Sequence, residues 1–159
     1  MIRKLILIRH GDAESRRLGE TDAQRRLTAR GVEALKRDYP ALLAPLKDDL
    51  DDIHVWSSEA VRAEQTAQVV CDVLGIPYDD IEFHQSLYAQ DYDFFCGELE
   101  AADGVVVAVG HIPFMEEVAS DLAKRMMSLT KGSIVCFDLS EGKLAKAKLL
   151  FAARGPKVW

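Results

Sequence analysis

Two purely aliphatic runs constrain the fold of this chain more than any other feature. They are Leu5–Ile8 and Gly104–Gly110. Apolar runs of this kind, without alternating polar residues, predict strands that are buried on both faces, as in the parallel sheets of α/β proteins. Segments with helical spacing lie between such runs. We therefore predict an α/β fold, a three-layer α/β/α sandwich with a mainly parallel sheet and helices on both faces.

The other expected elements continue this alternation. A helix is expected from Thr28, and Pro40 should kink it or end it. Gly75 should stop another helix. The remaining expected elements are a strand at 52–58, a helix at 59–74, a short strand in 81–99 with a helix near 92–101, a helix at 113–127, and a closing β-hairpin of 132–140 and 143–151.

Size and composition place the chain among globular proteins. Its 159 residues contain no repeat or linker, so we expect a single domain spanning 1–159. A formal net charge of −6 argues against nucleic acid as the main partner. No apolar segment is long enough for a membrane span or a secretory signal, which predicts a cytoplasmic protein without a membrane partner. Three cysteines without Cys-x-x-Cys spacing are interpreted as reduced core residues.

Three of the expected strands end in cationic or imidazole side chains. Arg9 and His10 follow the first strand, Arg62 lies shortly after the second, and His111 follows the aliphatic run that ends at Gly110. The carboxyl ends of parallel strands lie at the same edge of a sheet, where open α/β sheets bind their ligands. We therefore expect these side chains to meet around one pocket.

Arg62 is the strongest indication of an anionic ligand. With Ser58 as the expected N-cap, Arg62 falls near the first turn of its helix, where the macrodipole disfavours a cation by about 0.3 to 1 kcal/mol. A negative group should therefore bind there. A phosphoryl group fits, because guanidinium groups such as those of Arg62 and Arg9 bind its oxygens in a bidentate manner.

The two histidines have no metal-binding spacing, and neighbouring cations would repel a metal ion, so we predict no metal and no cofactor. The same cations keep imidazole neutral and nucleophilic. One imidazole, at His10 or His111, would attack phosphorus while the other donates to a phosphoryl oxygen. Gly11 is expected to let the backbone approach the phosphate closely.

Four motifs together resemble those of the histidine phosphatase superfamily, which has the phosphoglycerate mutase-like fold. They are "RHG" at 9–11, "LTARG" at 27–31, "SSEAVRAEQTA" at 57–67 and "VGH" at 109–111. The short chain and its "RHGDA" opening are most similar to the SixA-type phosphohistidine phosphatases. The resemblance implies that His10 is the nucleophile and becomes phosphorylated. It also implies that Arg9, Arg62 and His111 hold the phosphoryl oxygens.

Further site residues follow from the same resemblance. SixA-like sequences have an arginine just before the Leu-Thr pair, which is Arg25 here, with Arg26 as an alternative one residue away. Asp12 and Thr28 resemble supporting residues of the substrate site, and they fit equally well as a loop residue and a helix cap.

One departure from the superfamily bears on the substrate. Many members place a glutamate proton donor after a Leu-Tyr pair, and this chain has Ala89 there. Asp91 or Asp93 could replace it, although both also fit as ordinary surface acids. A missing general acid typically costs a factor of about 10² to 10⁴ on phosphate esters. A phosphohistidine tolerates the loss better, since its P–N bond is labile and its leaving imidazole can take a proton from water.

The short interval between Arg62 and His111 predicts a fold without the large helical cap of the mutases. An open pocket suits a phosphorylated side chain on another protein. We thus predict a phosphatase that acts on phosphohistidine of a protein. One alternative is a phosphomonoesterase or mutase that acts on a small phosphorylated substrate. The other is a non-catalytic, phosphate-dependent binding module.

Overall fold

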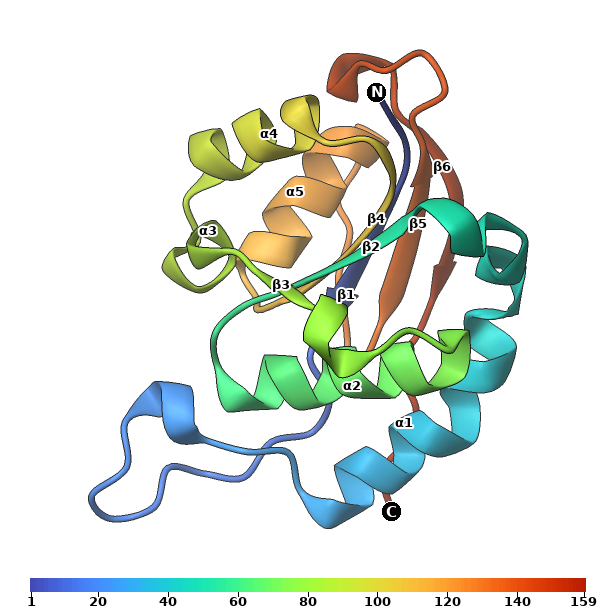
Figure 1. Ribbon diagram of the computed structural model, residues 1–159. Coiled ribbons are helices and arrows are strands. Elements are labelled where there is room, and N and C mark those ends of the chain that lie inside the picture. Colours follow the sequence, from blue (N-terminus) through green and yellow to red (C-terminus); the bar gives the residue numbers. More distant parts are fainter.

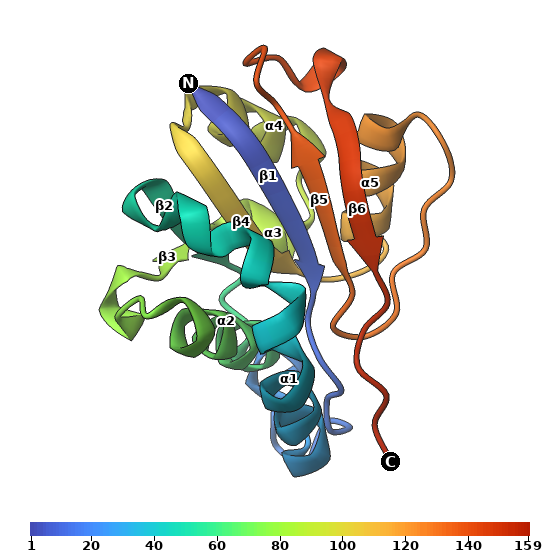
Figure 2. The same cartoon turned by 90° about the vertical axis from the view of Figure 1, so that its right-hand side faces the viewer.

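The computed structural model describes residues 1–159, and a six-stranded sheet forms its centre (Figure 1). The strands lie in the order β3-β2-β4-β1-β5-β6. Strands β3, β2, β4 and β1 are parallel to one another, whereas β5 is antiparallel to both β1 and β6 (Figure 2). The bounds are Ile2–Arg9 for β1, Ile53–Ser57 for β2, Glu82–Phe83 for β3, Gly104–Gly110 for β4, Ile134–Asp138 for β5 and Lys148–Ala153 for β6.

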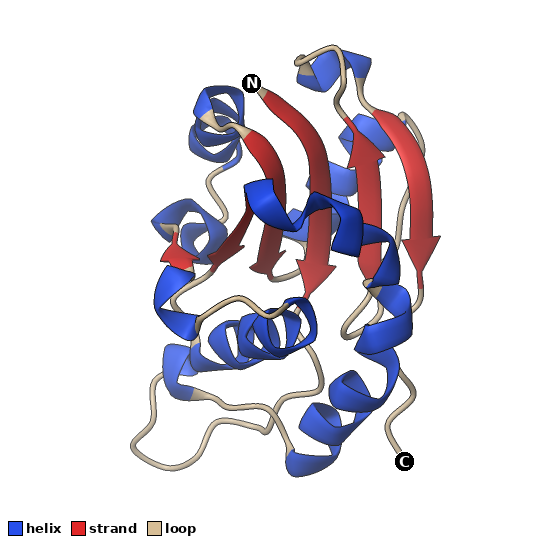
Figure 3. Cartoon of the chain, turned by 45° about the vertical axis from the view of Figure 1, so that its right-hand side comes forward, coloured by secondary structure: helices blue, strands red, loops and turns tan.

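Five α-helices cover the two faces of this sheet, and 3-10 helices of three to nine residues join some of the elements (Figure 3). Helices α1 and α2 pack on one face, and α3, α4 and α5 on the other (Figure 1). The predicted three-layer α/β/α sandwich is therefore confirmed. The bounds are Ala29–Leu42 for α1, Val61–Leu74 for α2, Gln85–Ala89 for α3, Tyr92–Ala101 for α4 and Phe114–Ala123 for α5.

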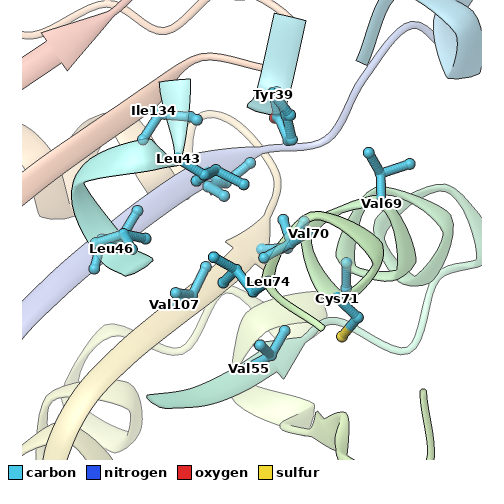
Figure 4. Packing of buried hydrophobic residues seen from close by; sticks show 14 of the residues in the cluster. Tyr39, Leu43, Leu46, Val55, Val69, Val70, Cys71, Leu74, Val107 and Ile134 are labelled. Atoms are coloured by element: carbon cyan, nitrogen blue, oxygen red, sulfur yellow. The ribbon is translucent and has the colours of Figure 1, made fainter. Parts of the chain in front are cut away.

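The aliphatic run of β1 explains why the sheet is covered on both sides. Ile6 and Ile8 belong to the core under α1 and α2, and Leu5 and Leu7 belong to the core under α4 and α5. All four side chains are completely buried. Each contributes about 1.5 to 3 kcal/mol by leaving water. Figure 4 shows the core under α1 and α2, where side chains from α2 meet those of β2 and β4.

Two helix boundaries near the site differ from the predicted ones. Helix α1 passes Pro40 and ends at Leu42, because a proline this close to the last turn removes little of the hydrogen-bond ladder. Helix α2 begins at Val61 with Ala60 as its N-cap, so the prediction that Ser58 caps the helix is wrong. The Ser58 hydroxyl accepts from the Ala60 amide and also contacts His111.

Two elements in the last third of the chain are shorter than predicted. Helix α5 stops at Ala123 instead of 127, because Lys124 adopts the left-handed conformation at φ 56°. The second strand of the hairpin starts at Lys148, since Leu144–Lys146 forms a 3-10 turn that precedes it. Neither change moves the carboxyl ends of β1, β2 and β4.

Candidate functional site

A pocket of about 460 Å³ lies at the carboxyl ends of the parallel strands. The strand register places these ends side by side, with Arg9 opposite Gly110 and Ser57 opposite Val109. His10 and His111 each follow the last residue of a strand, so their side chains reach the same space. The lining residues are Arg9, His10, Ala13, Asp22, Arg25, Arg62, Tyr88, Gln90, His111, Ile112 and Lys131.

The hydrogen bonding of His10 determines which of its ring nitrogens is free to react. Its Nδ1 lies 2.7 Å from the Gly11 carbonyl oxygen. A carbonyl can only accept, so Nδ1 carries the proton and Nε2 carries the lone pair. Burial, reinforced by the cationic Arg62 and Arg9, lowers the pKa of His10 to about 4 although the Gly11 bond opposes the shift. At neutral pH this imidazole is uncharged, with a nucleophilic Nε2.

His111 is the second imidazole of the pocket, and its ring centroid is 5.2 Å from that of His10. Its Nε2 lies 2.7 Å from the Ser58 hydroxyl oxygen, while its Nδ1 is buried without a partner. Burial lowers the pKa of His111 to about 3, and the neighbouring His10 and Arg62 add to this shift. His111 is therefore neutral at physiological pH and has an unused polar atom.

Arg9 is held by the loop that precedes β5. Its Nη1 donates to the Leu129 carbonyl at 2.9 Å, and its buried Nε has no hydrogen-bond partner. Burial lowers the pKa of this guanidinium, and Glu116 partly offsets that effect. A partly buried cation with a buried, unpaired N–H group favours an anion beside it.

Arg62 lies in the first turn of α2 and is 6 % exposed. A negative group was expected there, and the structure places Asp22 in that position. The Arg62 Nη2 donates to Asp22 Oδ2 at 2.9 Å, and Nη1 donates to the Asp22 carbonyl at 2.8 Å. This carboxylate compensates the charge that the helix dipole disfavours.

Sequence reasoning missed Asp22, and it also missed the lining residues Tyr88, Gln90 and Lys131. The Asp22 carboxylate also accepts from the Tyr88 hydroxyl at 2.9 Å and from Arg25 Nη1 at 3.2 Å. Burial would raise its pKa, but the hydrogen bonds from Arg62, Tyr88 and Arg25 outweigh burial and lower it to about 2. Asp22 begins a single 3-10 turn, Asp22–Gln24, in the polar stretch between β1 and α1. The only signal for it was the uncompensated charge expected at Arg62.

The structure distinguishes Arg25 from Arg26, the two candidates for the arginine that precedes the Leu-Thr pair. Arg25 lines the pocket, and its Nε donates to the Glu14 carbonyl at 2.9 Å. Arg26 is exposed and lies outside the pocket lining.

Asp12, Thr28 and Gly11 lie behind the pocket and do not line it. The Thr28 hydroxyl donates to Asp12 and accepts from the Gly31 amide as the N-cap of α1. The expectation that Gly11 lets the backbone approach a phosphate closely stays a prediction. A Cβ at Gly11 would lie 2.9 Å from Cδ1 of Leu35, so a larger residue there would require the Leu35 side chain to shift. These residues can position His10 and the loop that follows it.

The candidate proton donors are not brought to the pocket. Asp91 caps α4 by accepting from the Phe94 amide, and Asp93 is exposed. Ala89 is exposed as well, outside the lining. The carboxylate that the pocket does contain, Asp22, is ionised at neutral pH because its pKa is about 2. No cluster of three or more metal-ligating side chains occurs in the chain, and no helix is of membrane-spanning length and hydrophobicity.

The pocket combines imidazole and guanidinium groups at one edge of the sheet of an α/β/α sandwich, an arrangement suited to an anionic ligand. The family model of the histidine phosphatase superfamily (branch 1) matches residues 5–93, which is more than half of the chain. The chain belongs to this superfamily, and its membership supports phosphatase activity.

Solved structures with the same fold cover almost the whole chain. The protein histidine phosphatase SixA in complex with tungstate superposes with a TM-score of 0.78 at 22% identity, covering 95% of this chain and 96% of its own. A protein from Nakamurella multipartitia assigned as phosphohistidine phosphatase SixA has a TM-score of 0.74 at 22% identity, with 96% of each chain covered. A protein from Agrobacterium tumefaciens with the same assignment has a TM-score of 0.74 at 21% identity, and the match covers 95% of this chain and 97% of the other. A search of curated proteins found no significant match.

Proposed function

We propose that this protein hydrolyses phosphohistidine on another protein through a phosphohistidine intermediate at its own His10. The observation that carries the proposal is the tautomer of His10. Its Nδ1 proton is held by the Gly11 carbonyl at 2.7 Å, which leaves the Nε2 lone pair in a cationic pocket. A neutral imidazole beside guanidinium groups is suited to attack the phosphorus of a bound phosphoryl group.

The reaction proceeds in two transfers. In the first, Nε2 of His10 forms a bond to phosphorus, the P–N bond of the substrate breaks, and the leaving imidazole nitrogen takes a proton from water. In the second, water attacks phosphorus and releases a proton that neutralises the hydroxide left by the first step, the bond to Nε2 breaks, and inorganic phosphate leaves. Both transition states carry negative charge on the phosphoryl oxygens, so the same groups stabilise both steps.

Arg9, Arg62 and His111 are the groups that would hold these oxygens, with Arg25 at the rim. Arg9 Nε and His111 Nδ1 are the two buried polar side-chain atoms of the chain that have no hydrogen-bond partner. Phosphoryl oxygens would supply the missing partner for Arg9 and, where Nδ1 carries the proton, for His111. Asp22 occupies two donors of Arg62, one with its carboxylate and one with its main-chain carbonyl, and a bound dianion would share or displace that carboxylate.

The choice of phosphohistidine over a phosphate ester depends on the acid–base character of the pocket. Ester hydrolysis needs a protonated group beside the leaving oxygen, and Asp22, with a pKa of about 2, does not provide one at neutral pH. A leaving imidazole requires less assistance. The fold shared with the SixA structures agrees with this choice.

Substrate comparison tests the proposal directly. We expect kcat/KM on a phosphohistidine peptide to exceed kcat/KM on a phosphoserine peptide and on sugar phosphates by at least about 10², the lower factor for an absent general acid. His10→Ala should abolish turnover, whereas His54→Ala, which removes an exposed histidine, should retain it. Higher activity on sugar phosphates would indicate a small-molecule phosphomonoesterase. Binding of phosphate without release from any substrate would indicate a binding module.

A further inference from the structure

A second cavity, of about 550 Å³, adjoins the catalytic pocket and shares Arg9 and Lys131 with it. We name it the basic groove. Four of its five charged lining residues are cationic, namely Arg9, Lys131, Arg154 and Lys157, and the fifth is Asp12. The Asp12 carboxylate is already occupied by Lys131 Nζ at 2.8 Å and the Thr28 hydroxyl at 2.9 Å. The basic groove therefore presents a local positive charge on a chain whose net charge is −6.

The floor of the basic groove is fixed by specific packing of the segment 154–158 against the turn before β5. The Gly155 amide donates to the Thr130 hydroxyl at 2.9 Å and to the Ser133 hydroxyl at 3.1 Å. A Cβ on Gly155 would lie 1.7 Å from the Lys131 carbonyl oxygen, so only glycine permits this approach. Arg37 of α1 donates to the Lys157 carbonyl at 2.8 Å. These contacts hold Arg154 and Lys157 beside the catalytic pocket.

Neither Arg154 nor Lys157 has an acidic partner within ion-pair distance, although other exposed cations such as Arg3, Arg17 and Arg37 do. Both side chains are exposed. Unpaired cations next to a site that receives a substrate are available to bind a negative group of that substrate. An acidic partner would otherwise be repelled by the net charge of this chain.

We infer that the basic groove binds a carboxylate-rich segment of the substrate protein that flanks the phosphorylated histidine. The inference rests on the proposed function. The basic groove is larger than the catalytic pocket, and its four cations come from three separate segments: Arg9 after β1, Lys131 in the turn before β5, and Arg154 and Lys157 after β6. This arrangement suits several Asp or Glu side chains of an extended peptide. Binding there would orient the phosphorylated side chain towards His10.

The test compares two phosphohistidine peptides of one length, one with Asp and Glu beside the phosphohistidine and one with Asn and Gln at the same positions. The readout is the ratio of kcat/KM on the acidic peptide to kcat/KM on the amide peptide. For the wild-type protein we expect a ratio of about ten, from two exposed cation–carboxylate pairs. The ratio should fall towards one at about 1 M salt, where the screening length is about 3 Å.

The variant R154E/K157E should have a ratio near or below one. The matched control is K47E/K148E, which makes the same change in net charge with two exposed lysines that lie away from the basic groove and form no ion pair. The control should keep the wild-type ratio. A wild-type ratio of one, or an equal loss in both variants, would overturn the inference.

Free phosphohistidine separates failure of this inference from failure of the proposed function. If the wild-type protein hydrolyses it but does not distinguish the peptides, the basic groove is not a substrate subsite and the proposed function stands. If the protein hydrolyses no phosphohistidine compound, the proposed function fails. In that case, low-salt binding of the unphosphorylated acidic peptide still tests the basic groove. Equal affinity of the wild-type protein and R154E/K157E would overturn the inference.

Discussion

Replacing His111 with glutamine should make the protein less sensitive to acid. The pKa of His111 is about 3 in the folded protein, against an ordinary value of 6.5, because the ring is 5 % exposed and lies beside cationic neighbours. Between these two values the unfolded chain binds a proton that the folded chain does not. Folding stability therefore falls as the pH drops from about 6.5 towards 3.

The magnitude follows from the size of this shift. Each pKa unit corresponds to about 1.36 kcal/mol, so His111 alone should remove about 3 kcal/mol of stability between pH 7 and pH 4. Such a loss is a large fraction of the about 5 to 15 kcal/mol that stabilises a typical domain. Glutamine retains a polar group that can reach the Ser58 hydroxyl, now 2.7 Å from His111 Nε2, and it does not titrate.

Urea unfolding of the wild-type protein and of His111→Gln at pH 7 and pH 4 measures this difference. The variant should lose about 3 kcal/mol less than the wild-type protein over that interval. His54→Gln, which replaces an exposed histidine, is the control and should lose as much as the wild-type protein. An equal loss in His111→Gln and in the wild-type protein would refute the argument that this imidazole is buried in its neutral form.

Three further predictions concern other parts of the site and its surroundings. Arg62→Ala should lower kcat/KM on phosphohistidine by about 10² to 10³, as for other preorganised charge-stabilising groups, and a loss below tenfold would contradict its assigned role. Asp22→Asn removes the charge that competes for Arg62, so inhibition by inorganic phosphate should tighten about tenfold, and an unchanged inhibition constant would contradict that competition. Gly155→Ala should cost about 1 to 3 kcal/mol in urea unfolding, whereas Gly97→Ala, in open space on α4, should cost nothing; equal effects would refute the close approach to Lys131.

The sequence allowed much of the fold to be predicted because its strongest signals are local. The aliphatic runs that form β1 and β4 contain no polar alternation, so they indicated buried parallel strands without any knowledge of their partners. The register between β1 and β4 follows once the two strands are neighbours in the sheet. Boundaries were less predictable. Ser58, for example, bonds to His111 across the sheet edge instead of capping α2, and no local pattern shows that competition.

The part of the site that lies at the strand ends could be predicted from the sequence. Arg9, His10 and His111 directly follow aliphatic runs, and the motif around Arg62 is distinctive. Asp22 has no such position, since its role depends on contacts with Arg62 and Tyr88, which are 40 and 66 residues away in the chain.

The basic groove was unpredictable for a similar reason. It exists only because Gly155 lets the segment 154–158 pack against the turn before β5. The sequence shows the cations of that segment, but their place beside the catalytic pocket follows from long-range contacts.

The most direct test of the account is to identify the residue that carries phosphate during turnover. The wild-type protein would be mixed with labelled phosphohistidine peptide, quenched in alkali within the first turnover, digested and analysed by mass spectrometry. We predict phosphate on Nε2 of His10, stable in base and lost in acid, and none in His10→Ala. Phosphate on any other residue, or wild-type turnover by His10→Ala, would contradict the central claim.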